Sequence, residues 1–171
     1  MVSDYKDGLS ANKRLGGGVL LELSHEIDYL GWLFGRIKWL VAKISKQSSL
    51  EIDVEDTAHI IFGFENKESD GEIVATLDMD FIRHDTTRKC IAIGETGTLR
   101  WDGIEGIVDY CAIDSEGWHE LYSDKPERNY TYSEEIKHFI SCIESDNKPL
   151  VTGEDGLLSL TIVEAIKESA N

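Results

Sequence analysis

The sequence predicts an α+β fold: an open, mostly antiparallel β-sheet with helices packed on one face. Apolar residues at helical spacing mark one helix in the first part of the chain and two more helices at its end. A long run of short segments with strand-like patterning lies between them. Tight turns rich in glycine and acidic residues separate the β-patterned segments, so consecutive strands run in opposite directions. Helices flanking such a run are typical of a helix-covered antiparallel sheet, whereas a parallel, doubly wound sheet would alternate strands with helices.

The first helix is predicted over residues 18–34. Its apolar residues recur at alternating spacings of three and four, namely Leu20, Leu23, Ile27, Leu30 and Phe34. That spacing places them in one stripe on the buried side of a helix. Gly35 comes next and suits a helix C-terminus.

Seven short strands are predicted between residues 37 and 122. Period-two alternation of apolar and polar residues is clearest over residues 72–82. The predicted strands are residues 37–42, 57–64, 72–82, 90–93, 98–101, 107–113 and 118–122.

The second face of the predicted sheet also carries apolar residues. Ile61, Val74, Ile82 and Ile91 lie on alternate parity to the presumed core side. A sheet that is apolar on both faces needs a second cover. We therefore expect a homo-oligomer formed through the sheet face, and the alternative is that some of these are ordinary exposed apolar residues.

Two helices are predicted near the end of the chain. The first carries the stripe Ile136, Phe139, Ile140 and Ile143, and Thr131 with Glu134 has the spacing of a capping box for it. The second is predicted from about residue 154 to 169, with Leu158, Ile162, Ala165 and Ile166 as its apolar face.

Length and charge limit what the chain can be. A chain of 171 residues fits one domain, residues 1–171, with a substantial core. The net charge of -16 argues against a nucleic acid or an anionic membrane as partner, because both need a basic surface. No apolar run approaches the ~20 residues of a membrane span, and no signal peptide is visible. We interpret the three isolated cysteines as buried free thiols; they are Cys90, Cys111 and Cys142. Because free thiols are typical of a reducing compartment, we expect a cytoplasmic location.

The candidate site lies where three glycines, residues 16–18, run into the first helix. At about 100° per residue, one side of the helix opposite the apolar stripe carries Glu22, His25, Asp28, Tyr29 and Trp32. Carboxylates three positions away on either side favour the charged form of an imidazole, which suits acid/base catalysis near neutral pH. We interpret His25 and Glu22 as catalytic.

The remaining candidates are predicted to bind substrate. Gly17 and Gly18 permit a close approach of a ligand to the backbone, and Asp28, Tyr29 and Trp32 line the same side of the helix. Aromatic side chains there are better explained by a substrate or another domain than by water alone.

Two other interpretations of this helix stay open. A row of acidic residues around a histidine is also what the solvent-facing side of an ordinary helix looks like. Glu22 and His25 also have the i, i+3 spacing of di-iron carboxylate bundles, but that site needs a second such motif on a facing helix. A sheet-rich chain is a poor match, so we predict no metal site.

No nucleotide-binding motif is present. The sequence has no Gly-x-Gly-x-x-Gly after a strand, no P-loop and no Gly-x-Ser-x-Gly elbow. The glycines at residues 16–18 are not preceded by an apolar strand, so they are not a dinucleotide fingerprint. We predict no cofactor-binding residues in this chain.

Four segments together resemble a known enzyme family. Residues 16–33 resemble its glycine cluster and histidine-bearing helix, residues 56–66 resemble the next segment, residues 94–99 resemble its Gly-x-x-Gly-Thr-Leu turn, and residues 151–170 resemble its C-terminal helix. The family is that of glucose-fructose oxidoreductase, inositol dehydrogenase and MocA, and the resemblance is to its C-terminal α/β domain alone. That domain is an open antiparallel sheet similar to the one in glyceraldehyde-3-phosphate dehydrogenase.

The resemblance implies a function. Family enzymes join an N-terminal Rossmann domain, which binds NAD or NADP, to a domain like this one, which binds a sugar-like substrate and commonly mediates oligomerisation. His25 matches the family's catalytic or substrate-binding histidine. Many members carry an aspartate four residues before it, where this chain has Leu21, with Glu22 one position later.

We therefore expect the substrate-binding and oligomerisation domain of an NAD(P)-dependent oxidoreductase acting on a sugar, polyol or sugar derivative. The Rossmann domain is missing from these residues, so the chain alone is expected to be inactive. The alternative is a non-catalytic sugar-binding or assembly module.

Overall fold

The computed structural model describes residues 8–66, 71–125, 127 and 129–171, and the chain divides into two compact units. Unit 1 comprises Met1–Arg83 and Val151–Asn171, and unit 2 comprises His84–Leu150. Each unit is described on its own. The prediction of a single domain over residues 1–171 stays a prediction.

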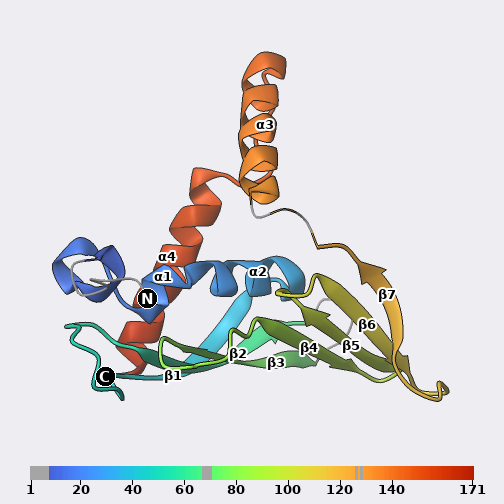
Figure 1. Cartoon of the computed structure of the whole chain (residues 1–171), viewed down its shortest axis with the longest axis horizontal. Helices are drawn as coiled ribbons and strands as arrows, with labels where there is room; N and C mark the ends of the chain where they lie inside the picture. The colour runs from blue at the N-terminus through green and yellow to red at the C-terminus, as the bar shows by residue number, and fades with distance from the viewer. Residues whose placement is uncertain (1–7, 67–70, 126, 128) are drawn as a thin grey trace. The chain divides into compact units, whose positions relative to one another are not determined.

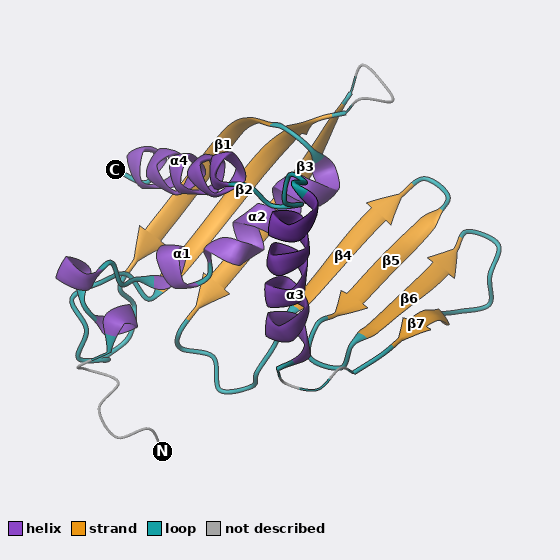
Figure 2. Cartoon of the chain, turned by 90° about the horizontal axis from the view of Figure 1, so that it is seen from above, coloured by secondary structure: helices purple, strands orange, loops and turns teal. Residues whose placement is uncertain are grey.

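Unit 1 is a three-stranded antiparallel sheet with helices on one face (Figures 1 and 2). The strands pair in the order β1-β2-β3. The short 3-10 helices η2 and η3 precede α1 and α2, and α4 returns to this unit after unit 2. The bounds are η2 (Leu9–Ala11), η3 (Lys13–Leu15), α1 (Val19–Glu22), α2 (Ser24–Phe34), β1 (Ile37–Ser45), β2 (Thr57–Glu65), β3 (Glu72–Asp80) and α4 (Gly153–Ser169).

The core of unit 1 lies between the sheet and its helices. Phe62 and Phe64 project from the central strand β2 and are fully buried, with ring centroids 5.8 Å apart. They belong to one apolar cluster with Leu20 of α1, Ile27 of α2 and Ile166 of α4. Every second residue of β2 from Ala58 to Phe64 therefore lies in the core, as expected for a strand with one buried face.

The first predicted helix is divided in two. Leu23 lies between α1 and α2 with φ -104° and ψ 23°, outside helical geometry, so the helix restarts at Ser24. The buried stripe survives the break, because Leu20, Ile27 and Leu30 are all buried. The break turns Glu22 relative to the residues of α2, which matters for the site.

Unit 2 contains a four-stranded antiparallel sheet in the order β4-β5-β6-β7 and the helix α3. The bounds are β4 (Lys89–Gly94), β5 (Gly97–Asp102), β6 (Ile107–Ala112), β7 (His119–Ser123) and α3 (Tyr130–Ser145). The predicted apolar stripe of α3 is exposed, and among the described residues of this helix only Cys142 is buried.

The predicted fold class, α+β with open antiparallel sheets and helices, is confirmed. Two details differ. The described strands form two separate sheets where the sequence predicted one. The capping box predicted for α3 at Thr131 and Glu134 is absent, because α3 begins at Tyr130; a capping box occurs instead on α4, where Thr152 and Asp155 bond reciprocally.

Candidate active site

His25 projects from α2 and is paired with the residue next to it. Its Nε2 lies 3.2 Å from Oε1 of Glu26. The His25 side chain is 54% exposed, while that of Glu26 is only 12% exposed. An imidazole beside a carboxylate is one arrangement that a general acid/base with an orienting partner can take.

Glu22, the predicted partner of His25, is engaged elsewhere. Its Oε2 accepts a hydrogen bond from the hydroxyl of Ser10, 2.7 Å away in η2. Because the helix breaks at Leu23, Glu22 ends α1 and His25 starts the first turn of α2. Their pairing in one continuous helix, as predicted, is therefore replaced by a contact between Glu22 and the segment that precedes the glycines.

Asp28, Tyr29 and Trp32 have different surroundings. Asp28 is exposed and its Oδ1 accepts from the hydroxyl of Ser159 on α4 at 2.9 Å. Tyr29 is half-buried and packs against the core cluster. Trp32 is 81% exposed. His25, Asp28 and Trp32 thus lie on the solvent side of α2, whereas Tyr29 is turned partly towards the core.

Gly17 and Gly18 are explained by packing within unit 1. A Cβ on Gly17 would lie 2.4 Å from the carbonyl oxygen of Leu9. A Cβ on Gly18 would lie 2.3 Å from Oε1 of Glu55, and Gly18 has φ +113°, which favours glycine. The glycines bring the backbone close to these two neighbours, and their predicted contact with substrate stays a prediction.

Residues just before β2 hold the start of α1 in place. The backbone N–H of Val19 donates to the carbonyl of Glu55, and the N–H of Leu20 donates to the Glu55 carboxylate at 3.3 Å. A carboxylate at a helix N-terminus satisfies N–H groups that have no partner inside the helix. Asp53 adds a contact to the lead-in by accepting from the N–H of Lys13 at 2.7 Å.

Asp56 fixes the loop next to this segment and is fully buried. Its carboxylate accepts from the N–H groups of Gln47 and Ser48 and from the hydroxyls of Ser48 and Thr57, at 2.6–2.9 Å. Burial alone would raise the pKa of this carboxyl, but these hydrogen bonds outweigh it and hold the pKa at about 2. Asp56 is therefore a charged structural anchor at the start of β2.

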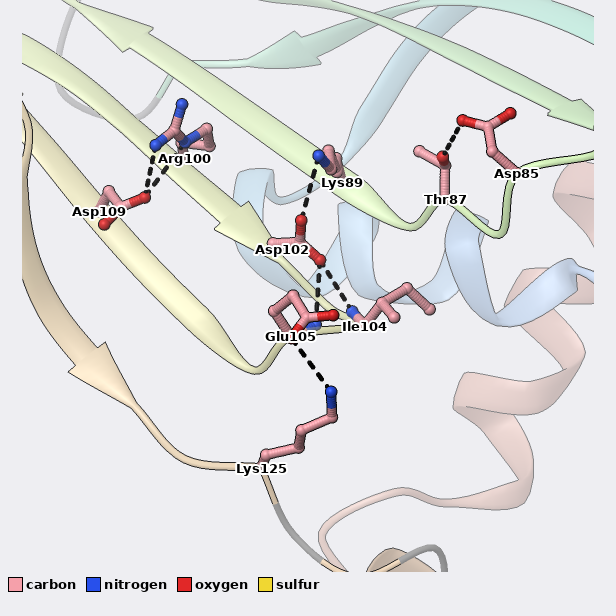
Figure 3. Close-up of polar contacts among 9 residues, drawn as sticks. All are labelled: Asp85, Thr87, Lys89, Arg100, Asp102, Ile104, Glu105, Asp109 and Lys125. Carbon is pink, nitrogen blue, oxygen red and sulfur yellow. Dashed lines mark hydrogen bonds and ion pairs between the residues drawn. The ribbon is translucent and has the colours of Figure 1, made fainter.

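Unit 2 has its own cluster of polar side chains, which is internally paired (Figure 3). Arg100 donates two hydrogen bonds to Oδ2 of Asp109, and its guanidinium lies 4.4 Å from the ring centroid of Trp118. Lys89 pairs with Asp102 at 3.1 Å. The backbone N–H of Glu105, followed by Lys89, lowers the pKa of Asp102. Each of these ion pairs joins two neighbouring strands of the sheet.

Two features are absent from the described part of the chain. No three His, Cys, Asp or Glu side chains there come close enough together to hold a metal ion. No helix there is long and apolar enough to cross a membrane.

Residues 9–171 match the profile of the GFO/IDH/MocA oxidoreductase family, in its C-terminal alpha/beta domain. The chain belongs to this family. A search of curated proteins found no match. The fold of this GFO/IDH/MocA domain recurs in solved structures that are less than 25% identical to it in sequence.

Three of those structures illustrate the likeness. An aldose-aldose oxidoreductase from Caulobacter crescentus, complexed with glycerol, has a TM-score of 0.79 and 20% identity over 99% of this chain and 50% of its own. The WlbA dehydrogenase from Bordetella pertussis, in complex with NADH and UDP-GlcNAcA, has a TM-score of 0.68 and 22% identity, and the match covers 94% of this chain and 46% of that protein. A biliverdin reductase from Synechocystis, in complex with biliverdin and NADP+, has a TM-score of 0.71 and 13% identity, and the match covers 95% of this chain and 49% of that protein. The chain therefore spans about half the length of these proteins.

Sequence reasoning missed the contacts that organise the site of this family member. Glu26 was not predicted as the partner of His25, because adjacent helical residues diverge by about 100° and do not normally face each other. Ser159 lies 131 positions after Asp28, and no local pattern marks it or singles out Ser10 within the lead-in. Glu55 lies 37 positions after Gly18, and no pattern in the sequence links it to the glycines.

Proposed function

We propose that this chain is the substrate-binding part of an NAD(P)-dependent oxidoreductase that acts on a sugar, a polyol or a sugar derivative. The observation that carries the proposal is the pairing of the exposed His25 with the nearly enclosed Glu26 on α2, within a GFO/IDH/MocA C-terminal domain. The names of two similar structures, an aldose-aldose oxidoreductase and a dehydrogenase with UDP-GlcNAcA, support a sugar-like substrate.

In this proposal His25 acts on the hydroxyl that is oxidised. Its imidazole takes the hydroxyl proton while the carbon-bound hydrogen leaves as hydride, and it returns the proton in the reverse direction. Glu26 holds the ring in place through the 3.2 Å contact with Nε2. NAD or NADP, bound to a separate dinucleotide-binding domain, supplies the hydride acceptor or donor.

The charges around His25 favour an uncharged ligand. Glu22, Glu26 and Asp28 all lie on α1 or α2, and the whole chain carries a net charge of -16. Carboxylates repel phosphates and carboxylates of a ligand but accept hydrogen bonds from sugar hydroxyls. The exposed indole of Trp32 adds a large apolar surface of the kind that binding sites use. We therefore propose that the substrate is a neutral aldose or polyol in preference to a sugar nucleotide.

These residues alone are proposed to bind substrate weakly and to catalyse no turnover, because they carry no nucleotide-binding motif. Cytoplasm is the proposed location, in line with the three free cysteines.

Isothermal titration calorimetry tests the proposal. Glucose or glycerol should bind with a millimolar Kd, His25→Ala should weaken this binding at least about fivefold, and His119→Ala, in unit 2, should leave it unchanged. NADH and NADPH should give no heat. Binding of a reduced nucleotide, or equal sugar binding by His25→Ala, would overturn the assignment.

We further propose that the chain self-associates through the sheet face that its helices leave open. Val41, Ile61 and Val74 on that face are 57%, 42% and 56% exposed, which is unusual for three apolar neighbours in the middle of a sheet.

The exposed apolar residues of this sheet face also favour the alternative function, a non-catalytic sugar-binding or assembly module. The DNA upstream of the Met1 codon separates the two: an in-frame Gly-x-Gly-x-x-Gly segment supports the enzyme, and a stop codon with a separate start supports the module.

A further inference from the structure

A histidine on α3 holds the segment that follows this helix. Nε2 of His138 lies 3.0 Å from the backbone nitrogen of Leu150 and accepts a hydrogen bond from its N–H group. The two residues are twelve positions apart, and the bond closes a loop made of the last turns of α3 and residues 146–150. We call this hydrogen bond the latch.

The turn at the end of α3 brings Leu150 back beside the helix. Asp146 adopts a left-handed conformation with φ 53° and ψ 37°, and its N–H group donates to the carbonyl of Cys142. The N–H group of Asn147 donates to the same carbonyl at 3.0 Å. A left-handed residue after a helix reverses the chain and satisfies carbonyls of the last turn. The latch therefore completes a reversal that the backbone begins.

The latch lies where the chain passes from one unit to the other. His138 and Leu150 both belong to unit 2, and Leu150 is the last residue of that unit. Thr152, two positions later, is the N-cap residue of α4. The latch is thus a contact within unit 2, and it fixes the point from which the chain leaves that unit.

The latch requires an uncharged imidazole. A ring nitrogen accepts a hydrogen bond through its lone pair, so Nε2 of His138 carries no proton while it accepts from Leu150, and the proton of the uncharged ring is on Nδ1. A second proton on Nε2 would turn this acceptor into a donor, and two N–H groups would face each other. Histidine is the side chain that ordinarily changes its charge between pH 5 and 8. A change of pH in this range therefore makes or breaks the latch.

Cys142 offers the charged ring a different partner. Its Sγ is buried one turn after His138 on α3 and lies 3.5 Å from Nε2. The thiol lies 3.9 Å from the carbonyl oxygen of Lys148 and donates to it, so the lone pairs of the sulfur face other groups. A protonated Nε2 can therefore donate to Sγ in place of accepting from Leu150.

Charged groups surround His138 on its own helix and in the segment after it. The two glutamates, three and four positions before it, lie on the same side of the helix and favour the charged ring, whereas the latch favours the uncharged ring. One of these glutamates is already paired, at 2.6 Å, with the lysine next to His138. The charged residues of both elements near the ring are Glu134, Glu135, Lys137, Asp146 and Lys148.

We propose that His138 is a pH-sensitive latch on the segment that joins the two units. With an uncharged imidazole the latch is closed, and Leu150 is held beside α3. With a charged imidazole the latch is open, and residues 146–150 gain conformational freedom. None of the candidate active-site residues takes part, so the latch does not depend on the proposed function.

Amide exchange with water, measured by nuclear magnetic resonance on the whole chain, tests the latch. The protection of the Leu150 amide is the exchange rate expected for a free amide at the same pH divided by the measured rate. It should be at least about threefold higher at pH 7.5 than at pH 5, as expected for the loss of one ordinary hydrogen bond.

Three variants assign the effect to His138. His138→Gln places a carbonyl oxygen that does not titrate near the position of Nε2, so the Leu150 amide should be protected equally at pH 7.5 and pH 5. His138→Phe has no acceptor and should lack the protection at both pH values. His119→Gln on β7, another exposed histidine of unit 2, is the matched control and should keep the pH dependence of the unaltered chain.

The nitrogen-15 shifts of the His138 ring give a second measurement that needs no variant. At pH 7.5 they should show the proton on Nδ1, whereas free histidine favours the proton on Nε2. Equal protection of Leu150 at both pH values, undiminished protection in His138→Phe at pH 7.5, or a proton on Nε2 at pH 7.5 would each overturn the proposal. Loss of the pH dependence in His119→Gln would overturn it too. If circular dichroism shows that a variant does not fold, the amide and ring measurements on the unaltered chain decide.

Discussion

Ser159 on α4 donates a hydrogen bond to Asp28 on α2 across 2.9 Å, joining two helices whose residues are 131 positions apart. The contact ties α2, the helix that carries His25, to a helix from the end of the chain. The candidate site therefore depends on α4 although none of the predicted site residues comes from it.

The Ser159–Asp28 contact should show as a coupling energy in a double-mutant cycle. Ser159→Ala and Asp28→Ala should each lower the free energy of unfolding by about 0.5–1 kcal/mol, and the double variant should lose less than their sum. Urea unfolding measures all three. Strict additivity would show that the two side chains do not interact in solution.

Asp56 should make stability depend on pH in the acid range. Its pKa of about 2 in the folded protein is lower than its ordinary value of 3.8, so the folded state favours the ionised form. The resulting stabilisation, about 2 kcal/mol, is present above pH ~4 and is lost as the pH falls through ~2. Urea unfolding of the unaltered chain at several pH values between 5 and 2 measures the loss.

Asp56→Asn should remove most of this acid dependence and destabilise the protein by about 2–3 kcal/mol at pH 7, because an amide cannot accept hydrogen bonds at both of its terminal atoms. If the Asp56→Asn variant still loses the same free energy of unfolding between pH 5 and 2, the pH dependence belongs to another carboxyl.

Gly18 should tolerate no side chain. Gly18→Ala should cost about 1–3 kcal/mol, since it combines a strained φ of +113° with a contact to Glu55. Gly31, inside α2, is the matched control, because a Cβ there meets nothing within 4 Å. Gly31→Ala should stabilise the helix by about 0.5–1 kcal/mol. Thermal unfolding compares the two, and equal effects would contradict the packing explanation for Gly18.

The sequence predicted the elements of unit 1 well because its strands and helices are amphipathic. The stripe of Leu20, Ile27 and Leu30 is buried as expected, and so are alternate residues of β2. The break at Leu23 was not predictable from that stripe, since the apolar spacing continues across it unchanged. The contacts of Glu55 with Val19 and Leu20 at the start of α1 are long-range, and local periodicity carries no information about such contacts.

The candidate site was predicted only in part for the same reason. His25 and Trp32 lie on the exposed side of α2 as predicted, because helical geometry alone fixes their direction. The predicted Glu22–His25 pairing required an unbroken helix. The observed partner, Glu26, depends on side-chain rotamers and burial, which the sequence pattern does not specify.

The most direct test of the central claim is a nuclear magnetic resonance titration with glucose, following the indole N–H signals of the four tryptophans. Trp32 lies two turns beyond His25 on the same side of α2, whereas Trp39, Trp101 and Trp118 lie on strands or in turns elsewhere. Substrate binding at the candidate site predicts a saturable shift of the Trp32 signal that disappears in His25→Ala, with the other three signals unmoved. A saturable shift at Trp39, Trp101 or Trp118 with Trp32 unmoved, or no shift at any of the four, would contradict the assignment of α2 as the substrate-binding surface.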